Sequence, residues 1–173
     1  MFKFITANTI TIRKYQEADL PRLTKLWNEI VEGGISFPQD SPLLPEEAAE
    51  FFAAQTVTAC AFEHNADGTE TMVGFYILHP NNVGRCAHIA NASYGVTANC
   101  RGKGVGRLLV QNCMDEAKAN GFLGLQFNAV VSTNFGAIAL YSSLGMSILG
   151  TVKNGFHMPS GEYVDTYIFF KAL

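Results

Sequence analysis

The chain has little charge and no block of consecutive basic residues. Charged residues make up 16% of its 173 residues, and the formal net charge is −3. Proteins that wrap nucleic acid or lie on anionic membranes need the opposite balance. No apolar run is long enough to span a bilayer, and residues 1–11 lack the basic-then-apolar layout of a secretion signal. We therefore expect a cytoplasmic protein with neither nucleic-acid nor membrane partners.

The chain also lacks the cysteine spacings of zinc sites and disulfide frameworks. None of its four cysteines lies in a C-x-x-C pair, so we expect free thiols and no metal site. Three of them fall in segments with strand or helix patterns and are expected to be buried: Cys60, Cys86 and Cys113. Cys100 lies next to a basic loop and is expected to be more exposed. A nucleophilic role for it would need a base partner that the sequence does not identify.

Apolar residues are plentiful. They make up 48% of the chain, which at this length predicts one domain, residues 1–173, with a substantial core. Apolar periods of two and of three to four residues predict the order β-α-α-β-β-β-α-β-α-β-β, an α/β fold with one mixed sheet. The predicted strands are 9–15, 57–62, 72–78, 86–96, 125–131, 146–152 and 163–170. The predicted helices are 19–33, 45–52, 105–119 and 134–144.

The most informative stretch is Arg101–Gly106, which reads R-G-K-G-V-G between a predicted strand and a predicted helix. Glycines leave the backbone open to a ligand, and the first N–H groups of a helix carry the positive end of its dipole, so this stretch predicts an anion cradle. Lys103 adds positive charge. A G-x-G-x-x-G motif fails because Arg107 stands where the last Gly is needed, and no P-loop is present. From the residues alone, a solvated helix start is the alternative.

The pattern Arg/Gln-x-x-Gly-x-Gly/Ala, formed here by Arg101, Gly104 and Gly106, resembles the cofactor loop of the GNAT superfamily of N-acetyltransferases. The resemblance implies a single-domain GNAT fold, whose mixed, mostly antiparallel sheet is splayed between strands 4 and 5 and flanked by helices. It implies acetyl-CoA as co-substrate, with its pantetheine paired to the backbone at Val96. The residues implied for its pyrophosphate are Arg101, Gly102, Lys103, Gly104, Val105 and Gly106. The strand-4 bulge of that family is expected at Tyr94–Val96, since an interior Gly marks a bulge or a close backbone approach.

A second segment, Asn134-x-x-Ala-x-x-Leu-Tyr-x-x-x-Gly-Met, resembles the GNAT pattern after strand 5. In that family the Asn holds the cofactor and the Tyr hydroxyl lies near its sulfur. The resemblance therefore implies that Asn134 binds acetyl-CoA and that Tyr141 protonates the departing thiolate as general acid. An ordinary tyrosine pKa near ~10 keeps that proton available at neutral pH. The alternative for Tyr141 is a core aromatic on a short helix.

A narrower resemblance concerns residues 85–92 and 127–134. They are similar to fungal N-acetyltransferases that act on proline analogues such as azetidine-2-carboxylate, which implies that Asn91 and Asn128 bind and polarise the substrate. Independently, asparagine has low strand propensity, and both asparagines have apolar neighbours, so we expect buried amides that need partners. The alternative is that each amide satisfies a bulge in the backbone.

The acceptor and its base are less defined. We expect direct attack of a small-molecule amine on the thioester, but neither His79 nor Glu63, both near strand ends, is a convincing base, and His88 is expected on the strand face opposite Asn91. The proline-rich loop 33–44 is either a substrate lid, with Phe37 as a binding residue, or a connector with Phe37 packed beneath it. Family habit implies a homodimer, with the aromatic strand 163–170 as an edge contact.

Two other functions stay open. A phosphinothricin-type acetyltransferase is suggested by the order of a helix, an aromatic loop and a second helix that begins Pro-Glu-Glu at Pro45. A non-catalytic acyl-CoA-binding sensor would bind the same cofactor without transfer. Such a sensor has no need of Asn134 or Tyr141, which favours the enzyme.

Overall fold

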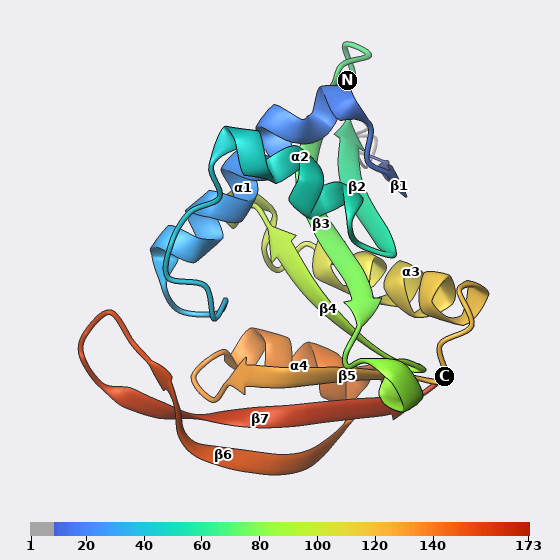
Figure 1. Cartoon of the computed structure of the whole chain (residues 1–173). Coiled ribbons are helices and arrows are strands. Elements are labelled where there is room, and N and C mark those ends of the chain that lie inside the picture. The colour runs from blue at the N-terminus through green and yellow to red at the C-terminus, as the bar shows by residue number, and fades with distance from the viewer. Residues whose placement is uncertain (1–8) are drawn as a thin grey trace, which may run out of the picture.

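A computed structural model describes residues 9–173, and its helices and strands follow one another in the predicted order (Figure 1). The strands are β1 (Ile10–Lys14), β2 (Val57–His64), β3 (Glu70–Pro80), β4 (Ile89–Val96), β5 (Gly124–Val131), β6 (Ser147–His157) and β7 (Tyr163–Ala172). The helices are α1 (Leu20–Gly33), α2 (Pro45–Ala53), α3 (Val105–Ala119) and α4 (Phe135–Ser143). None of the helices in residues 9–173 has the length and apolar character that a membrane span requires.

The seven strands form one sheet in the order β1-β2-β3-β4-β5-β7-β6. Neighbouring strands are antiparallel except β4 and β5, which are parallel. These two strands pair only at Ile89–Gly124 and Ala90–Leu125. Beyond those positions they diverge toward their carboxyl ends, which gives the V seen in Figure 1. The predicted splay between strands 4 and 5 is therefore confirmed.

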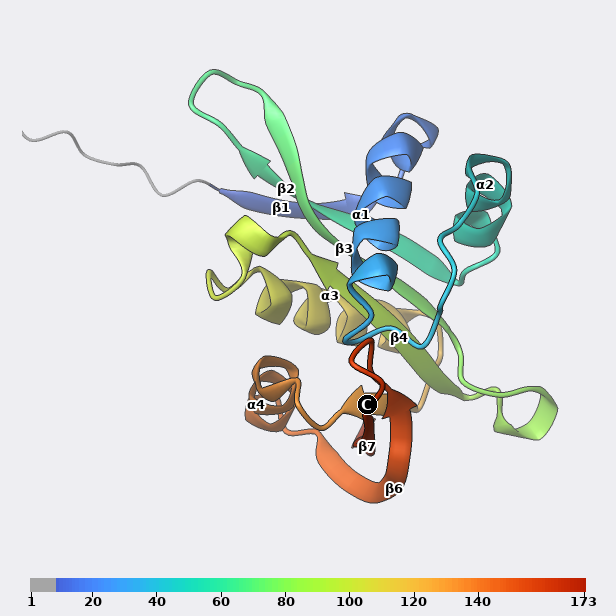
Figure 2. The same cartoon turned by 90° about the vertical axis from the view of Figure 1, so that its left-hand side faces the viewer.

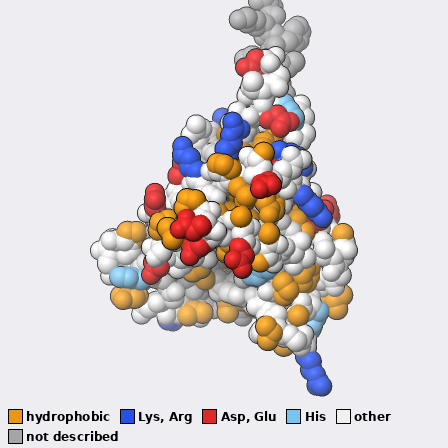
Figure 3. Space-filling view, turned by 45° about the horizontal axis from the view of Figure 1, so that its top comes forward, with side chains coloured by type: hydrophobic (Ala, Val, Ile, Leu, Met, Phe, Trp, Pro, Cys, Tyr) orange, Lys and Arg blue, Asp and Glu red, His pale blue; other side chains and the backbone are white. Residues whose placement is uncertain are grey.

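Helices cover both faces of the sheet (Figure 2). Along β3, Phe75 and Ile77 pack in one core cluster with α1 and α2, whereas Tyr76 and Leu78 pack in the other with α3. This alternation is the two-residue period of a strand buried on both sides. The predicted apolar face of α3 is confirmed, because all of its predicted core residues are buried: Val105, Leu109, Val110, Cys113, Met114 and Ala117. On the surface seen in Figure 3, acidic and basic side chains are interspersed.

The expected cysteine environments are wrong at two positions. The strand predicted from Cys86 begins only at Ile89, because Gly84–Cys86 forms a short 3-10 helix that turns the chain back from β3, and Cys86 is exposed there. Cys100 is buried instead, since the 3-10 helix Ala98–Cys100 packs it into the core beneath α3.

The predicted strand-4 bulge is also absent. The pairing of β3 with β4 runs without a register shift from Gly74–Val96 to Pro80–Ala90. Gly95 is instead explained by the close approach of other residues to the backbone, because a Cβ at this position would overlap Phe75 and Ile30. A register shift lies in β5 instead, between Phe127 and Val130.

The strand predicted from the sequence to lie at the edge of the sheet is not an edge strand in the structure. β7, which contains residues 163–170, pairs with β5 on one side and β6 on the other, so it lies inside the sheet. β6 is the edge strand at this end of the sheet, and its side chains are exposed along most of its length.

Candidate active site

The start of α3 has the open backbone that the predicted anion cradle requires. Its N-cap residue, Gly104, has φ 86°, a left-handed conformation that glycine adopts without strain. The first bond to that cap is donated by the Leu108 N–H to the Gly104 carbonyl, so the helix leaves the preceding N–H groups, from Val105 to Arg107, without helical partners. Apart from the two adjacent residues in the chain, no described residue has an atom within 4 Å of the Cβ positions of Gly102 and Gly104. The cradle is thus open to a phosphate-sized group.

The cradle opens into a cavity of about 730 Å³ between β4, α3 and α4. The predicted cofactor residues that line it are Val96, Arg101, Gly102, Gly104, Gly106, Asn134 and Tyr141. Lys103 and Val105 do not line it. Val105 is buried in the core, so only its backbone is available to a ligand. Sequence reasoning missed Arg107, which lines the cavity and donates a hydrogen bond to Ser143 Oγ at 2.7 Å, tying α3 to α4.

The edge of β4 at the splay carries backbone donors. The Ile89 carbonyl accepts a bond from Asn81 N–H at 2.7 Å, and Thr97 N–H donates to the Val73 carbonyl at 3.0 Å, so the odd-numbered positions of β4 face β3. In an antiparallel strand the even-numbered positions then turn their N–H and C=O groups the other way. Val96 and Tyr94 therefore direct their N–H groups toward the splay.

Tyr141 lies at the end of the cavity toward β5. Its ring packs against Phe127 at 4.6 Å and Phe169 at 5.6 Å between centroids, and it is half-buried. Tyr141 contacts the core and also lines the cavity, so its position is compatible with both interpretations of this residue, and its role as general acid stays a prediction. The expectation of an ordinary pKa is wrong: burial, with a smaller effect of Cys113, raises the pKa of Tyr141. The phenol keeps its proton at neutral pH but is a weaker acid than the sequence suggests.

Tyr94 is a second buried phenol that sequence reasoning did not assign. It lines the cavity, its ring centroid lies 6.3 Å from that of Tyr141, and its hydroxyl finds no N or O partner among residues 9–173. Burial raises its pKa, as burial raises that of the neighbouring Cys113 thiol to about 12. No sequence signal marks Tyr94, because an aromatic residue is ordinary in a strand.

Asn134 has a structural contact beside its predicted role. It is the N-cap of α4, and its Oδ1 accepts a hydrogen bond from Ala137 N–H at 3.2 Å. The oxygen is therefore engaged, which leaves the Nδ2 group of a cavity-lining residue for a ligand.

Asn91 and Asn128 do not line this cavity. Asn91 stands opposite His79 in the β3–β4 register, and His79 continues the face of Phe75 and Ile77, which packs against α1 and α2. Asn91 is half-buried, and its Oδ1 accepts a bond from its neighbour's N–H, that of Ala92, at 2.8 Å. A backbone contact of this kind is the alternative considered for Asn91 from the sequence.

The expectation of a buried amide is wrong for Asn128, which is exposed. It follows the point where β5 leaves β4 and lies at the β5 register shift, so β4 no longer shields it. Its partners are side chains: Gln126 Nε2 donates to Asn128 Oδ1 at 2.9 Å, and Asn128 Nδ2 donates to Asn81 Oδ1 at 2.6 Å. Neither partner was singled out from the sequence.

Of the histidines considered from the sequence, His79 is the one placed beside Asn91. Its Nδ1 lies 2.9 Å from the Pro80 carbonyl oxygen. A carbonyl oxygen only accepts, so in the neutral ring the proton sits on Nδ1 and Nε2 carries the lone pair. His88 is exposed and lies just before β4 begins.

Phe37 is part of the core and not of the cavity wall. It is 7% exposed and packs against Trp27 at 4.8 Å between ring centroids. These contacts support the alternative in which Phe37 packs beneath the loop, and its substrate-binding role stays an untested prediction. The neighbouring residues Ile35 and Ser36 line the cavity instead, together with Met158 from the β6–β7 turn.

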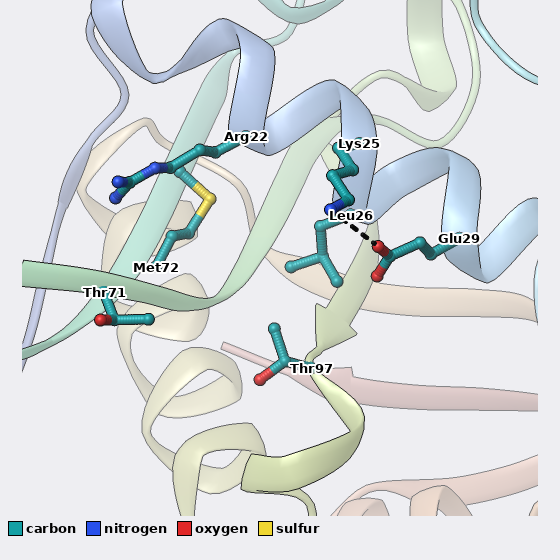
Figure 4. Close-up of a pocket in the computed structure, with 7 residues that line it drawn as sticks. All are labelled: Arg22, Lys25, Leu26, Glu29, Thr71, Met72 and Thr97. Carbon is teal, nitrogen blue, oxygen red and sulfur yellow. Dashed lines mark ion pairs between the residues drawn. The ribbon is translucent and has the colours of Figure 1, made fainter.

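A smaller hollow of about 220 Å³ lies between α1, β3 and the end of β4 (Figure 4). Lys25 and Glu29 on its wall form an ion pair at 3.9 Å, so they offset each other's charge. It contains none of the sequence-predicted site residues. No group of three or more metal-ligating side chains is found in residues 9–173.

The splayed sheet and the cavity at its opening place the protein in the class of acetyltransferases that are built around such a V. Residues 21–146 match the model of the acetyltransferase (GNAT) family, and the chain belongs to this family.

Three similar proteins span nearly the whole chain. The N-acetyltransferase aca1 of Schizosaccharomyces pombe is 30% identical over 178 residues, which cover 95% of this chain and 85% of that protein. A GCN5-related N-acetyltransferase from Kribbella flavida is 38% identical with a TM-score of 0.85, over 95% of this chain and 98% of that one. A phosphinothricin acetyltransferase from Sinorhizobium meliloti, solved with AcCoA, is 22% identical with a TM-score of 0.84, over 95% and 89% of the two chains. At that identity, the last shows the fold alone.

Proposed function

We propose that the protein is an acetyl-CoA-dependent N-acetyltransferase whose acceptor is the amine of a small amino-acid-like molecule, with proline analogues as the favoured class. The observation that carries this proposal is the single cavity that joins the α3 cradle to the open edge of β4 and to Tyr141. A thioester ligand with a pyrophosphate at its other end fits such a cavity. The space above Gly102 and Gly104, which any larger residue would fill, supports the fit.

Acetyl-CoA supplies an acetyl group activated as a thioester. Arg101 and the N–H groups at the start of α3 hold its pyrophosphate, because both offer positive charge to an anion. The N–H groups of Tyr94 and Val96 hold the pantetheine along the open edge of β4. These contacts fix the position of the thioester, and positioning of this kind contributes a large part of the rate in such transfers.

Tyr141 stabilises the departing thiolate. An ordinary thiol has a pKa of about 8.5, and burial raises the pKa of Tyr141 above the ordinary tyrosine value, so complete proton transfer from the phenol is uphill. A hydrogen bond from the phenol to the sulfur does not require this unfavourable proton transfer. The structure therefore favours hydrogen bonding over full protonation as the contribution of Tyr141.

The acceptor amine lies on the face of β4 and β5 that carries Asn91 and Asn128. The amine must be neutral to attack, and His79 Nε2 on the same face is a proton acceptor for it. The similarity to the N-acetyltransferase aca1 of Schizosaccharomyces pombe over 95% of the chain supports transfer to an amine. The resemblance of residues 85–92 and 127–134 to the fungal enzymes that act on proline analogues favours an acceptor of that type.

Thiol release from acetyl-CoA tests this proposal. The amine panel contains azetidine-2-carboxylate, phosphinothricin and several ordinary amino acids. We expect turnover with azetidine-2-carboxylate. Turnover with phosphinothricin alone favours the phosphinothricin-type alternative, and tight CoA binding without turnover on any amine favours the sensor.

Cytoplasmic location and a homodimer belong to the same proposal. Free cysteines at all four positions, three of them buried, fit a reducing compartment. The edge strand β6 exposes apolar side chains at Ile148, Leu149 and Val152, and they offer a surface to a second copy. Light scattering during gel filtration measures the mass in solution, and a monomeric mass at micromolar concentration contradicts the dimer.

A further inference from the structure

Three aromatic rings fill the splay on the face of the sheet that α3 covers. Tyr94 of β4 lies 5.6 Å from Phe127 of β5 and 6.3 Å from Tyr141 of α4, and Phe127 lies 4.6 Å from Tyr141, all between ring centroids. Each ring therefore contacts the other two. Since β4 and β5 make their last pair at Ala90–Leu125, the rings occupy the gap that opens just beyond this pair.

Tyr94 is the ring that separates the cavity from the core beneath α3. It lines the cavity, whereas Phe127 is 4% exposed and does not line it. On its other side the Tyr94 ring lies 6.1 Å from the buried ring of Tyr76, and its hydroxyl is buried beside the thiol of Cys113. Removal of the Tyr94 ring would therefore extend the cavity into the space that the ring now fills.

The proposed position of the thioester leaves its acyl chain one direction in which to extend. The sulfur lies near Tyr141 and the pantetheine follows the open edge of β4, so the acyl chain lies on the far side of the carbonyl carbon. The amine attacks from the face that carries Asn91 and Asn128, and a chain directed toward that face would obstruct the attack. A longer chain must therefore turn toward the α3 face, where the ring of Tyr94 closes the gap.

We infer that Tyr94 is a specificity-determining residue whose ring closes the cavity beyond the thioester carbonyl and restricts the transferred group to acetyl. This inference rests on the proposed function and names the class of acyl group that the same site accepts. A ring that only stabilised the sheet beneath α3 would not distinguish one acyl-CoA ester from another.

The experiment compares acetyl-CoA with butyryl-CoA, whose acyl chain is two methylene groups longer. The acceptor is the amine of the panel that the wild type acetylates fastest. In the wild type, kcat/KM should be about 100-fold lower with butyryl-CoA, because each methylene that a pocket cannot hold costs about tenfold or more. Tyr94→Ala should reduce this preference for acetyl-CoA to less than about tenfold, since the longer chain then occupies the space of the ring.

Two variants separate the ring of Tyr94 from its hydroxyl and from its contribution to stability. Tyr94→Phe keeps the ring and removes a hydroxyl that has no N or O partner among residues 9–173, so the preference should not change. Leu109→Ala is the matched control for lost packing, because Leu109 is buried on α3 and does not line the cavity. It should lower the melting temperature and leave the preference as it is in the wild type.

Thermal melting shows which variants are folded. If Tyr94→Ala does not fold, Tyr94→Leu takes its place, and it should shift the preference in the same direction by a smaller factor. A folded variant that keeps the wild-type preference overturns the inference, and so does a wild type that uses both donors equally well. Both results leave acyl transfer to an amine standing.

Failure of the proposed function gives a different result. If the wild type transfers an acyl group to no amine, calorimetric binding of the two acyl-CoA esters replaces turnover. Binding of butyryl-CoA that tightens relative to acetyl-CoA in Tyr94→Ala supports the inference in that case. No binding of either ester, or an unchanged ratio of the two affinities, overturns it.

Discussion

The proposed cofactor side and the proposed acceptor side of the splay are built from different parts of the polypeptide. On the cofactor side, the cradle consists of backbone N–H groups at the start of α3, and the wall is formed by half-buried aromatic rings such as that of Tyr141. On the acceptor side, side-chain amides from β4, β5 and the end of β3 provide the polar groups, and Asn128 is exposed. Backbone groups serve a ligand that is common to a whole family, whereas side chains can change with the acceptor.

The largest effect that we expect tests whether Phe37 belongs to the core or to the acceptor side. Phe37→Ala should lower the free energy of unfolding by about 3 kcal/mol, because it removes a buried ring that packs against Trp27. Urea denaturation measures this loss. At a temperature where the variant is folded, the KM for the acceptor should be unchanged.

Phe135→Ala is the control for Phe37→Ala, since Phe135 is 75% exposed and its loss should affect unfolding little. If the Phe37→Ala protein is as stable as the wild type and its KM for the acceptor is raised, Phe37 contacts the acceptor and belongs to the acceptor side.

The next effect belongs to the cofactor side. Tyr141→Phe should lower kcat about 100-fold with little change in CoA affinity, because it removes one hydrogen-bond donor to the departing sulfur and keeps the packed ring. The raised pKa of Tyr141 keeps the phenol protonated below about pH 10, so any alkaline fall of wild-type kcat below that pH comes from another group. Stopped-flow thiol release and CoA titration separate the two quantities. A collapse of CoA affinity would instead show that Tyr141 acts through packing.

The cradle itself is tested by Gly104→Val. A β-branched residue at φ 86° is strained, and its side chain fills the space that the cradle leaves open, so CoA affinity should fall about 30-fold. Equilibrium dialysis with CoA measures the change. Gly136→Ala is a milder control on the same cavity, because no atom lies near its Cβ position and its φ is not left-handed. An unchanged affinity for CoA in Gly104→Val would mean that the pyrophosphate lies elsewhere.

The same contrast explains what could be predicted from the sequence. The bounds of α3, Val105–Ala119, are those predicted, since a glycine cap and an apolar period of three to four residues are both local signals. The 3-10 helix Gly84–Cys86 has no such period, so the start of β4 was misplaced. Gly95 fits a bulge and a close approach equally well, and only the position of Ile30 and Phe75 decides between them.

The side-chain contacts of the acceptor side could not be predicted from the sequence, because they depend on tertiary structure. Asn81 and Asn128 are 47 residues apart, and only the β3–β4–β5 register brings their side chains together. Exposure of Asn128 and burial of the Tyr141 phenol likewise follow from tertiary packing. Residue type alone indicates neither of them.

The smallest expected effect tests whether His79 takes the proton of the amine on the acceptor side. His79 stands opposite Asn91, and its Nδ1 is engaged by the Pro80 carbonyl, which leaves Nε2 as a lone pair on the acceptor face. His79→Gln keeps a polar side chain but cannot take a proton. The kcat/KM for the amine should fall about tenfold, which is less than the roughly 100-fold minimum typical of a general base, because water replaces His79 in part.

Added imidazole should restore part of the lost rate in His79→Gln, and the affinity for CoA should not change, because the cradle is on the other side of the splay. His88→Gln is the matched control, since His88 is exposed and lies before β4 begins. Full activity in His79→Gln would mean that water takes the proton from the amine. The acceptor side would then act through hydrogen bonds alone, and its amides would carry its entire contribution to the rate.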